Sequence, residues 1–417
     1  MTGPTPSIAI DARWVERLVM ELAAFGAYAD TGAWRPVYTP EWVAAAHCFE
    51  GWCKEAGLAV HGDAVGNIWG RLEGRNEGAS IVSGSHLDTQ CPGGRYDGAL
   101  GAIAALVAIK ALKDQFGQPR RTLEVLALCE EEGSRFATAG FWGSRAIIGK
   151  IAPSDPETTI GRAGETMADA MRAVGLDPAR IPEARRTDID TFVELHIEQG
   201  PILEQAGLPV AIVDAITGMR HTEYVLTGVA NHAGAFPMDL RNDPMAGFAE
   251  IASGVINTAH RLGRPAVTTV GRVAVEPNAP AIIPRAVTFT VDARHPDSAK
   301  RAVLYELHEE LISEVAARRG LTVESRILFD HAPCLSDLGL LETLKRVAAE
   351  QSISTMVMAS GAGHDTQQIA AVAKRVAMIF VRSKDGRSHT PEEFSTLEDM
   401  VAGIKVLAAG LYALAYG

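Results

Sequence analysis

The sequence predicts an α/β protein with a mixed, largely parallel sheet and a smaller α+β domain inserted into its chain. In the first half, apolar strand patterns alternate with helical patterns, as in sheets whose parallel strands are joined by right-handed crossovers. Near residue 212 the pattern changes to amphipathic strands between long helices, and after Asp330 the first pattern returns. We therefore expect a main domain of residues 1–212 and 329–417, and an inserted domain of residues 213–328.

The elements of the main domain follow from apolar periodicity and from the turn residues between them. Before the change of pattern we expect helices at 13–26, 40–57 and 99–116, short strands with turns within 58–72, and buried strands at 79–86 and 121–128. After it we expect a helix at 337–351, a strand at 375–381 and a last helix from Thr396. Ligands of such sheets gather beyond the carboxyl ends of the strands, so polar residues that follow a strand are the candidates for chemistry.

The inserted domain contains two strand-helix units. The amphipathic stretches 221–230 and 286–295 are typical of half-exposed strands, and helical patterns at 244–262 and 297–320 follow them. Two such units predict a small antiparallel sheet covered by helices on one face.

The composition excludes several classes of partner. The 417 residues carry a net charge of −12 with a pI near 5.5, whereas binding to a phosphate backbone needs a basic face. The N-terminal stretch lacks the basic start and apolar core of a signal peptide, and no apolar run reaches membrane-spanning length. The odd number of scattered cysteines fits a reducing compartment. We expect a cytoplasmic protein with no nucleic-acid or membrane partner.

The stretch GSHLDTQCPGGRYDGALG at residues 84–101 places His86, Asp88 and Asp97 in one glycine-rich loop after a buried strand. On its own, the loop is explained equally well by aspartates that cap turns and a histidine bonded to a backbone carbonyl. Three adjacent carboxylates, residues 130–132, follow the next strand, where their charge needs compensation by cations.

Two further histidines occupy a similar setting. His196 lies between Glu194 and Glu198 in the strand-like stretch TFVELHIEQG, and His389 follows an apolar strand and a glycine turn in DGRSHTPEE. Imidazole and carboxylate ligands together suit zinc, or else manganese, cobalt or nickel. A carboxylate shared by two such ions, about 3.5–4 Å apart, would balance the charge of the glycine-rich loop.

Taken together, these stretches resemble the hydantoinase/carbamoylase amidases, a family that is similar to the dinuclear zinc exopeptidases. The resemblance runs from residue 60 to residue 395 and rests on the ordered motifs GSHLDT with GGRYDGALG, EEEGSRF, ELHIEQGP, GVANHAGAFPM, and SGAGHD with GRSHTPEE. It implies a dinuclear zinc exopeptidase-like catalytic domain, an inserted ferredoxin-like lid or dimerisation domain, two divalent metal ions per chain and a homodimer.

The resemblance also implies roles for the residues of the metal site. Asp88 would orient the imidazole of His86 and raise its basicity. Glu131 would be the general base, which takes a proton from the metal-bridging water and delivers it to the leaving nitrogen. The implied metal ligands are His86 and His196 for one ion, Glu132 and His389 for the other, and Asp97 as the bridge.

Further residues match family positions that face the substrate. Taken alone, His232 in GVANHAG would be explained as a buried structural histidine. The resemblance implies instead that it reaches across a dimer interface and stabilises the oxyanion of the tetrahedral intermediate. Arg294 in VDARH would hold the substrate carboxylate through a bidentate pair. The remaining candidates are Gln199 for a polar contact to the ureido or carboxylate group, His364 for support of the substrate or metal site, and Arg220 and Arg241.

The chain departs from the family pattern at two positions. Ala281 stands where the family commonly has an asparagine that helps Arg294 to hold the substrate, and Arg285 stands where a glycine is usual. Because alanine offers neither donor nor acceptor, the departure bears on the identity of the substrate and not on the metal chemistry.

We therefore expect a metal-dependent amidohydrolase that cleaves the C–N bond of an N-carbamoyl-L-amino acid or a related ureido acid. Allantoate and N-acyl-amino acids are alternative substrates. A metal-bound binding protein without catalysis is the alternative of another class, but such a protein would have no use for a proton shuttle at Glu131. A dipeptidase would need room for a free amino terminus, and the forms EEEGSRF and HIEQG favour the carbamoylase branch.

Overall fold

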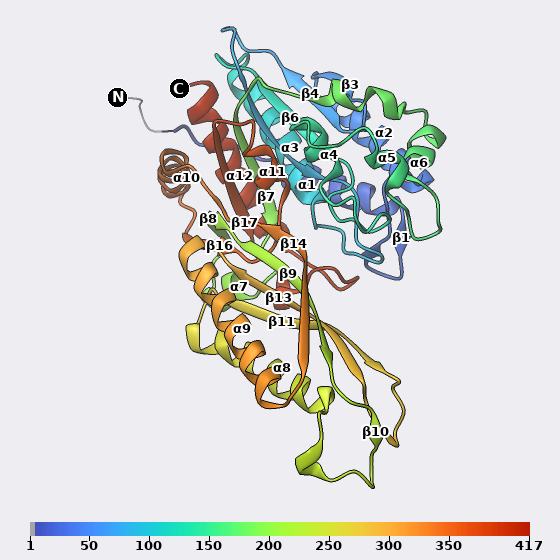
Figure 1. The fold of residues 1–417 in the computed structure, drawn as a ribbon. Coiled ribbons are helices and arrows are strands. Elements are labelled where there is room, and N and C mark those ends of the chain that lie inside the picture. The colour runs from blue at the N-terminus through green and yellow to red at the C-terminus, as the bar shows by residue number, and fades with distance from the viewer. Residues whose placement is uncertain (1–4) are drawn as a thin grey trace. The chain divides into compact units, whose positions relative to one another are not determined.

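The structure is a computed structural model that describes residues 5–417, so the first four residues of the expected main domain lie outside the described residues. The chain forms two compact units (Figure 1). Unit 1 comprises the chain up to Asp214, Leu335–Met358 and His364–Gly417, and unit 2 comprises Ala215–Cys334 with Ala359–Gly363. None of the helices formed by residues 5–417 is long and apolar enough to cross a membrane.

Unit 1 is built on a mixed sheet of nine strands, which confirms the expected α/β fold. Its centre is parallel, in the order β17 (Arg375–Val381), β7 (Ile189–Ile197), β5 (Ser80–His86) and β6 (Leu123–Leu128). Antiparallel strands flank this centre: β8 (Val210–Ile216) next to β17, and β4 (Ile68–Leu72) and β3 (Ala59–Gly62) beyond β6. Short β15 (Cys334–Leu335) and β16 (Thr355–Ser360) pair with β8.

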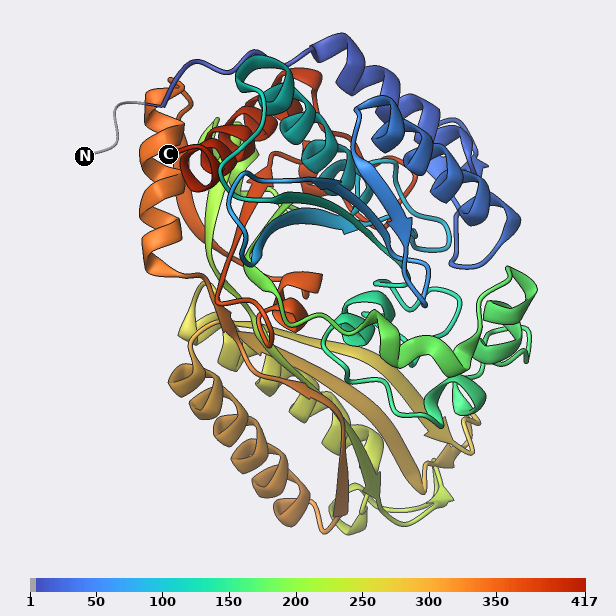
Figure 2. The ribbon, with the colours of Figure 1, turned by 90° about the horizontal axis from the view of Figure 1, so that it is seen from above.

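The parallel strands are buried on both faces, which is why their sequences read as continuous apolar runs. Helix α3 (Ala99–Phe116) packs along β5, β6 and β7, and α12 (Leu397–Ala415) packs beside it. A Cβ at Gly101 would come within 2.2 Å of the carbonyl oxygen of Leu195, so the small residues of α3 permit its close approach to the sheet. Figure 2 shows this helical layer on one side of the sheet.

The remaining helices of unit 1 pack against this layer and against the sheet. α1 (Ala12–Ala24) packs against α3 and α12, α2 (Pro40–Glu55) against β3 and β4, and α10 (Leu338–Glu350) against α12. Asp11, Thr39, Asp337 and Thr396 cap helices α1, α2, α10 and α12 by accepting backbone N–H bonds. The short elements are β1 (Ala27–Tyr28), β2 (Gly32–Ala33), α4 (Trp142–Ile147), α5 (Asp155–Thr158), α6 (Met167–Ala173), η1 (Pro178–Ala184), α7 (Ile202–Ala206), α11 (Asp365–Ile369) and η3 (Lys384–Gly386).

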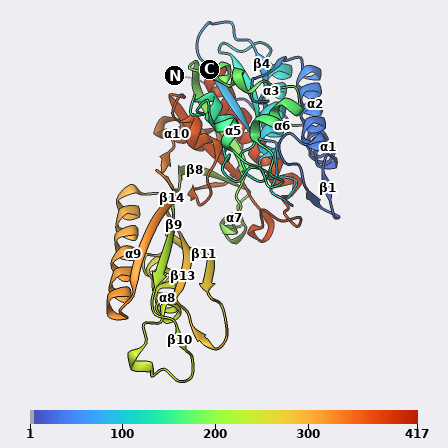
Figure 3. The same ribbon diagram turned by 45° about the vertical axis from the view of Figure 1, so that its right-hand side comes forward.

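Unit 2 has the element order β9 (Gly218–Thr227), α8 (Pro244–Leu262), β11 (Val267–Glu276), β13 (Ala286–His295), α9 (Ser298–Arg318) and β14 (Thr322–His331). Its antiparallel sheet has the order β11-β13-β9-β14, which is a ferredoxin-like arrangement. Helices α8 and α9 lie along the sheet (Figure 3) and close an apolar core around Phe289. Unit 2 also contains two short strands that pair with each other, β10 (Asn231–His232) and β12 (Ile282–Ile283), and the short helix η2 (Met238–Leu240).

The amphipathic pattern of the sequence predicted β9 and β13 but not β11 and β14. The missed strands are the two edges of the sheet, and their side chains are largely exposed, so they lack the apolar alternation that marks β13. The role of unit 2 as a lid or dimerisation domain stays a prediction.

Candidate active site

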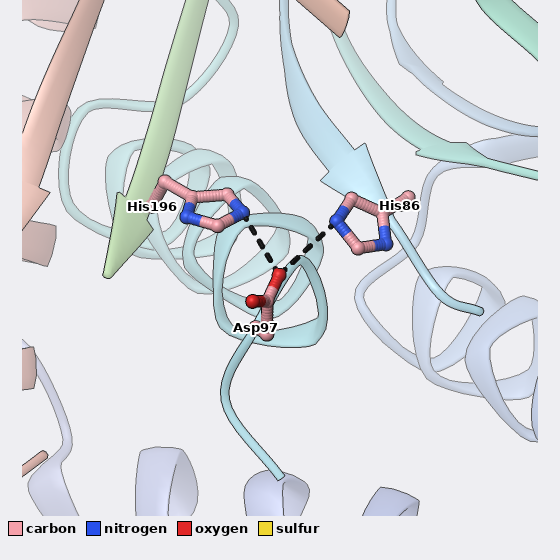
Figure 4. Close-up of side chains that lie close together, drawn as sticks. All are labelled: His86, Asp97 and His196. Carbon is pink, nitrogen blue, oxygen red and sulfur yellow. Dashed lines mark ion pairs between the residues drawn. The ribbon is translucent and has the colours of Figure 1, made fainter. Parts of the chain in front are cut away.

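Two histidines at the ends of neighbouring parallel strands face one aspartate (Figure 4). His86 is the last residue of β5, His196 lies at the end of β7, and Asp97 lies in the loop that leads into α3. Oδ1 of Asp97 is 3.4 Å from Nε2 of His86 and 3.3 Å from Nε2 of His196. All three side chains are buried, and their ligand atoms lie within 4.8 Å of one another, so the group could hold one metal ion.

The other oxygen of Asp97 faces a second group. Oδ2 lies 3.5 Å from Nε2 of His389, and the same nitrogen lies 3.5 Å from Oε1 of Glu132. Asp97, Glu132 and His389 therefore also place ligand atoms within 4.8 Å of one another. Asp97 belongs to both groups, with one oxygen in each, which is the arrangement that a carboxylate needs in order to bridge two ions.

The protonation of the two buried histidines suits metal binding. Nδ1 of His86 lies 3.0 Å from the backbone oxygen of Asp88, and Nδ1 of His196 lies 3.0 Å from that of Ile197. Because a carbonyl oxygen can only accept, Nδ1 carries a proton in each ring, and Nε2 is the ring nitrogen turned towards Asp97. The backbone N–H of Gly98 donates to Nε2 of His196 at 3.2 Å, in agreement with this tautomer.

Within residues 5–417, no lysine or arginine forms an ion pair with the buried carboxylates of this region. Burial first, and then the charge of Asp97, raises the pKa of Glu132 to about 8. The pKa of Glu131 is raised well above its usual range, chiefly by burial, with the charge of His86 opposing the rise. Oε1 of Glu132 is buried without a hydrogen-bond partner. Within residues 5–417, every ion pair of Asp88, Asp97, Glu131 and Glu132 is with a histidine, so divalent cations fit this donor set.

Glu131 adjoins the first group. Its Oε2 lies 3.8 Å from Nε2 of His86, and His86, Glu131 and Glu132 form a third set with ligand atoms within 4.8 Å. Glu130 directly before it has a positive φ of 47°, so the chain leaves the strand geometry of β6. This irregular backbone lets both Glu131 and Glu132 face the same bay, whereas adjacent strand residues would point apart.

Asp88 holds the glutamate loop with its carboxylate and the imidazole of His86 with its backbone. Oδ1 accepts the N–H of Glu131 and Oδ2 accepts the N–H of Glu132, each at 3.1 Å. The resemblance implied that the carboxylate of Asp88 orients His86. Oδ1 of Asp88 is, however, 3.7 Å from Nδ1 of His86, farther than the backbone oxygen of Asp88 at 3.0 Å. Asp88 thus joins the two loops that follow β5 and β6.

Three side chains that the sequence analysis did not single out contact the candidate ligands. Ser388 donates to Oδ2 of Asp97 at 2.6 Å, and Gln90 donates to Oε2 of Glu132 at 2.8 Å. Glu393 is buried and accepts the backbone N–H of Asp97 at 2.9 Å. Ser388 and Glu393 lie within the GRSHTPEE motif and Gln90 lies within the glycine-rich stretch of residues 84–101, so these motifs were the available signal.

Gln199 and His364 also lie in this region. Gln199 has a positive φ of 58° and donates through Nε2 to Oδ2 of Asp97 at 2.8 Å. The buried ring of His364 packs edge-on against His196 with centroids 4.6 Å apart, and Glu194, His196 and His364 form a fourth set that could hold an ion. The contact of Gln199 with a substrate stays a prediction.

Arg294 and Arg220, two of the arginines predicted to bind substrate, are already paired within unit 2. Arg294 donates to both oxygens of Asp292, at 3.0 Å from Nε and 2.7 Å from Nη2, and to the backbone oxygen of Gly361. Although burial opposes it, His221 and Arg294 lower the pKa of Asp292 to about 2. Arg220 pairs with Asp330 at 2.7 Å, and its guanidinium lies 4.3 Å from the ring centroid of Tyr305. A structural ion pair therefore accounts for the position of Arg220.

His232 is exposed at the end of the short strand β10 in unit 2. The backbone oxygen of Ala281 accepts the N–H of Ala233, so the position where the family pattern is broken adjoins the His232 turn. Arg285 forms an ion pair with Glu276 on the surface of the same unit.

Comparison with known proteins shows the family of the chain. The model of peptidase family M20/M25/M40 matches residues 82–413. An allantoate amidohydrolase of Escherichia coli (strain K12) is 39% identical over 406 residues, which cover 96% of this chain and 98% of the relative. An N-carbamoyl-L-amino acid amidohydrolase of Geobacillus stearothermophilus is 38% identical over 402 residues, with coverage of 96% and 97%. The crystal structure of a hydantoinase/carbamoylase family amidase from Burkholderia multivorans has a TM-score of 0.91 at 32% identity, with coverage of 99% and 100%.

Proposed function

Because the chain belongs to peptidase family M20/M25/M40 and, within it, to the hydantoinase/carbamoylase amidases, we propose that it hydrolyses the ureido C–N bond of an N-carbamoyl-L-amino acid or of allantoate. It is an amidohydrolase of non-peptide C–N bonds. The observation that carries the proposal is the position of Asp97 between His86 with His196 on one side and Glu132 with His389 on the other.

His86, His196 and Asp97 would hold one divalent ion, and Asp97, Glu132 and His389 would hold a second. Zinc is the first candidate, with manganese, cobalt and nickel as alternatives. When bound, such ions supply positive charge that polarises the scissile carbonyl and makes a water molecule more acidic.

The protein's own groups divide the remaining work. Glu131 takes a proton from the attacking water as the C–O bond forms, and returns it to the leaving nitrogen as the C–N bond breaks. Asp88 holds the backbone of Glu131 and thereby fixes where its carboxylate lies. Hydrolysis of the ureido group yields an amine and carbamic acid, which decomposes to ammonia and carbon dioxide.

The proposal also assigns roles to two residues of unit 2. His232 donates to the carbonyl oxygen as its negative charge develops, from the partner subunit of a homodimer. Arg294 exchanges part of its pairing with Asp292 for the carboxylate of the substrate. Ala281 offers no amide side chain to a simple carbamoyl-amino acid, so allantoate is kept as the second candidate.

A hydrolysis screen tests the proposal. Carbamoyl-, formyl- and acyl-amino acids and allantoate are incubated with the protein and each of several divalent metals, and ammonia and amine are measured. The proposal predicts metal-dependent release of ammonia from at least one ureido acid. Turnover of formyl- or acyl-amino acids without turnover of any ureido acid would contradict it.

A further inference from the structure

The turn that carries His232 fixes the orientation of its imidazole. Nδ1 accepts the backbone N–H of Gly234 and that of Ala235, each at 3.0 Å. A ring nitrogen that accepts two hydrogen bonds carries no proton, so the single proton of the neutral ring is on Nε2. The side chain as a whole is exposed, so the Nε2–H is the polar group that the turn offers to a binding partner.

The guanidinium of Arg241 binds the backbone of this turn. Nη2 of Arg241 donates to the backbone oxygen of Ala233 at 2.6 Å and to that of Phe236 at 2.8 Å, and Nε donates to Phe236 at 3.1 Å. The two carbonyls flank Gly234 and Ala235, whose N–H groups hold the ring. Arg241 forms no ion pair with a carboxylate within residues 5–417, so its donors are directed to these carbonyls.

The base of the turn is fixed by strand pairing. β10 pairs with β12 through His232 and Ile282, and the N–H of Ala233 donates to Ala281 at 3.0 Å. The backbone on one side of the ring is thus held by β12 and the backbone on the other side by Arg241. A planar guanidinium with several donors can bind two carbonyls in fixed directions, which a single ammonium group cannot do.

We propose that Arg241 is a positioning residue that holds the 233–236 turn so that His232 presents its Nε2–H outward as a fixed hydrogen-bond donor. The inference rests on the proposed function for its consequence, because a fixed donor stabilises a developing oxyanion without reorganisation. Without Arg241 the turn loosens, Gly234 and Ala235 release Nδ1, and the imidazole rotates and populates both tautomers. The ground-state substrate needs this donor less than the transition state does, so kcat falls more than KM rises.

The test compares Arg241→Gln with Arg241→Lys and with the matched control Arg318→Gln, which removes an exposed guanidinium of α9 that pairs with Glu250 of α8 in the same unit. Histidine-selective ¹⁵N NMR, assigned through His232→Gln, reads the ring nitrogens, and hydrogen exchange reads the amides of residues 233–236. In Arg241→Gln we expect the protonated and unprotonated ring signals to move towards each other and amide protection in the turn to be lost. We expect partial retention in Arg241→Lys and no change in Arg318→Gln.

Kinetics on the substrate found in the hydrolysis screen give the second readout. We expect kcat of Arg241→Gln to fall about 10- to 100-fold with a small change in KM, less than the loss of about 100- to 1,000-fold expected when the donor itself is removed. Unchanged ring signals and amide protection in folded Arg241→Gln would overturn the inference. Altered ring signals in a protein whose wild type hydrolyses no ureido acid would leave the positioning intact and refute the proposed function instead.

Discussion

Oδ1 of Asp97 lies 3.3 Å from Nε2 of His196, while Oδ2 of the same carboxylate is turned towards His389. One residue thus joins a group at the ends of β5 and β7 to a group formed by the loops after β6 and β17.

The two neighbouring glutamates should differ in role. Glu131→Gln removes the proposed proton shuttle but leaves His86, Asp97, His196, Glu132 and His389 in place. We expect turnover to be abolished while bound metal, measured by elemental analysis, stays near two ions per chain. Glu132→Gln should instead lose metal. Loss of metal from Glu131→Gln would show that the roles of the two glutamates are exchanged.

Gly98 should be required for the position of His86. It has a φ of 63° at the start of α3, and a Cβ there would lie 2.3–2.4 Å from atoms of the His86 ring. Gly117 at the other end of α3 has a φ of 72° with no atom near a built Cβ, so Gly117→Ala is a control for backbone strain alone. We expect each alanine variant to lower the free energy of unfolding by about 1–3 kcal/mol.

Gly98→Ala and Gly117→Ala should differ in their affinity for metal. In Gly98→Ala the imidazole must move, so metal affinity measured by chelator competition should fall at least tenfold, whereas Gly117→Ala should bind metal as the wild type does. Equal metal affinity in the two variants would show that the space beside His86 does not determine its position.

Arg294→Ala should weaken the binding of carboxylate substrates. The variant removes the guanidinium and frees Asp292 to repel the substrate carboxylate, so we expect KM to rise by one to two orders of magnitude with a smaller change in kcat. The double variant Arg294→Ala with Asp292→Asn controls for this repulsion and should recover part of the loss. A KM equal to that of the wild type would remove Arg294 from the substrate site.

Unit 2 should lose stability in mild acid through His308. This buried histidine of α9 lies 3.4 Å from Oγ1 of Thr268, and burial lowers its pKa to about 4. The unfolded chain protonates the same side chain near its ordinary pKa of about 6.5, so unfolding takes up a proton between these two values. The free energy of unfolding should therefore fall as the pH drops from about 6.5 to about 4, by an amount on the order of 3 kcal/mol.

Chemical denaturation of unit 2 at pH 7 and pH 4.5 measures this effect. His308→Gln keeps a polar side chain but removes the titration, so its loss of stability on acidification should be smaller than that of the wild type. His260→Gln, at an exposed position of α8, should behave as the wild type does. The same acid dependence in His308→Gln and wild type would assign it to other groups.

The proposed donor across a dimer interface can be tested by complementation. Mixing His232→Ala chains with Glu131→Gln chains gives some dimers in which one site has both an intact base and an intact donor. We expect these mixtures to recover partial activity that neither variant has alone. Verified mixed dimers without activity would place the action of His232 within its own chain.

The sequence predicted the parallel centre of unit 1 well because its strands are buried on both faces and α3 is apolar from Ala99 to Ile109. It also predicted that residues after these strands would meet, since parallel strands bring their carboxyl ends to one edge. The edge strands β11 and β14 were missed because exposed side chains leave no periodic signal.

Contacts within the site were less accessible to sequence reasoning. That Asp88 holds His86 through its backbone oxygen, and the glutamate loop through its carboxylate, depends on local turn geometry that residue types do not encode. The pairing of Arg220 with Asp330 likewise joins positions 110 residues apart in the chain. A motif identifies which residues are present near a site, but not which of their atoms are already engaged.

The proposed function requires Asp97 to bridge two divalent ions. Anomalous X-ray scattering from crystals of zinc-loaded protein shows where such ions bind. We predict two peaks per chain, one beside His86 and His196 and one beside Glu132 and His389, with Asp97 between them. A single peak, or a pair of peaks of which one lies outside these groups, would contradict the account.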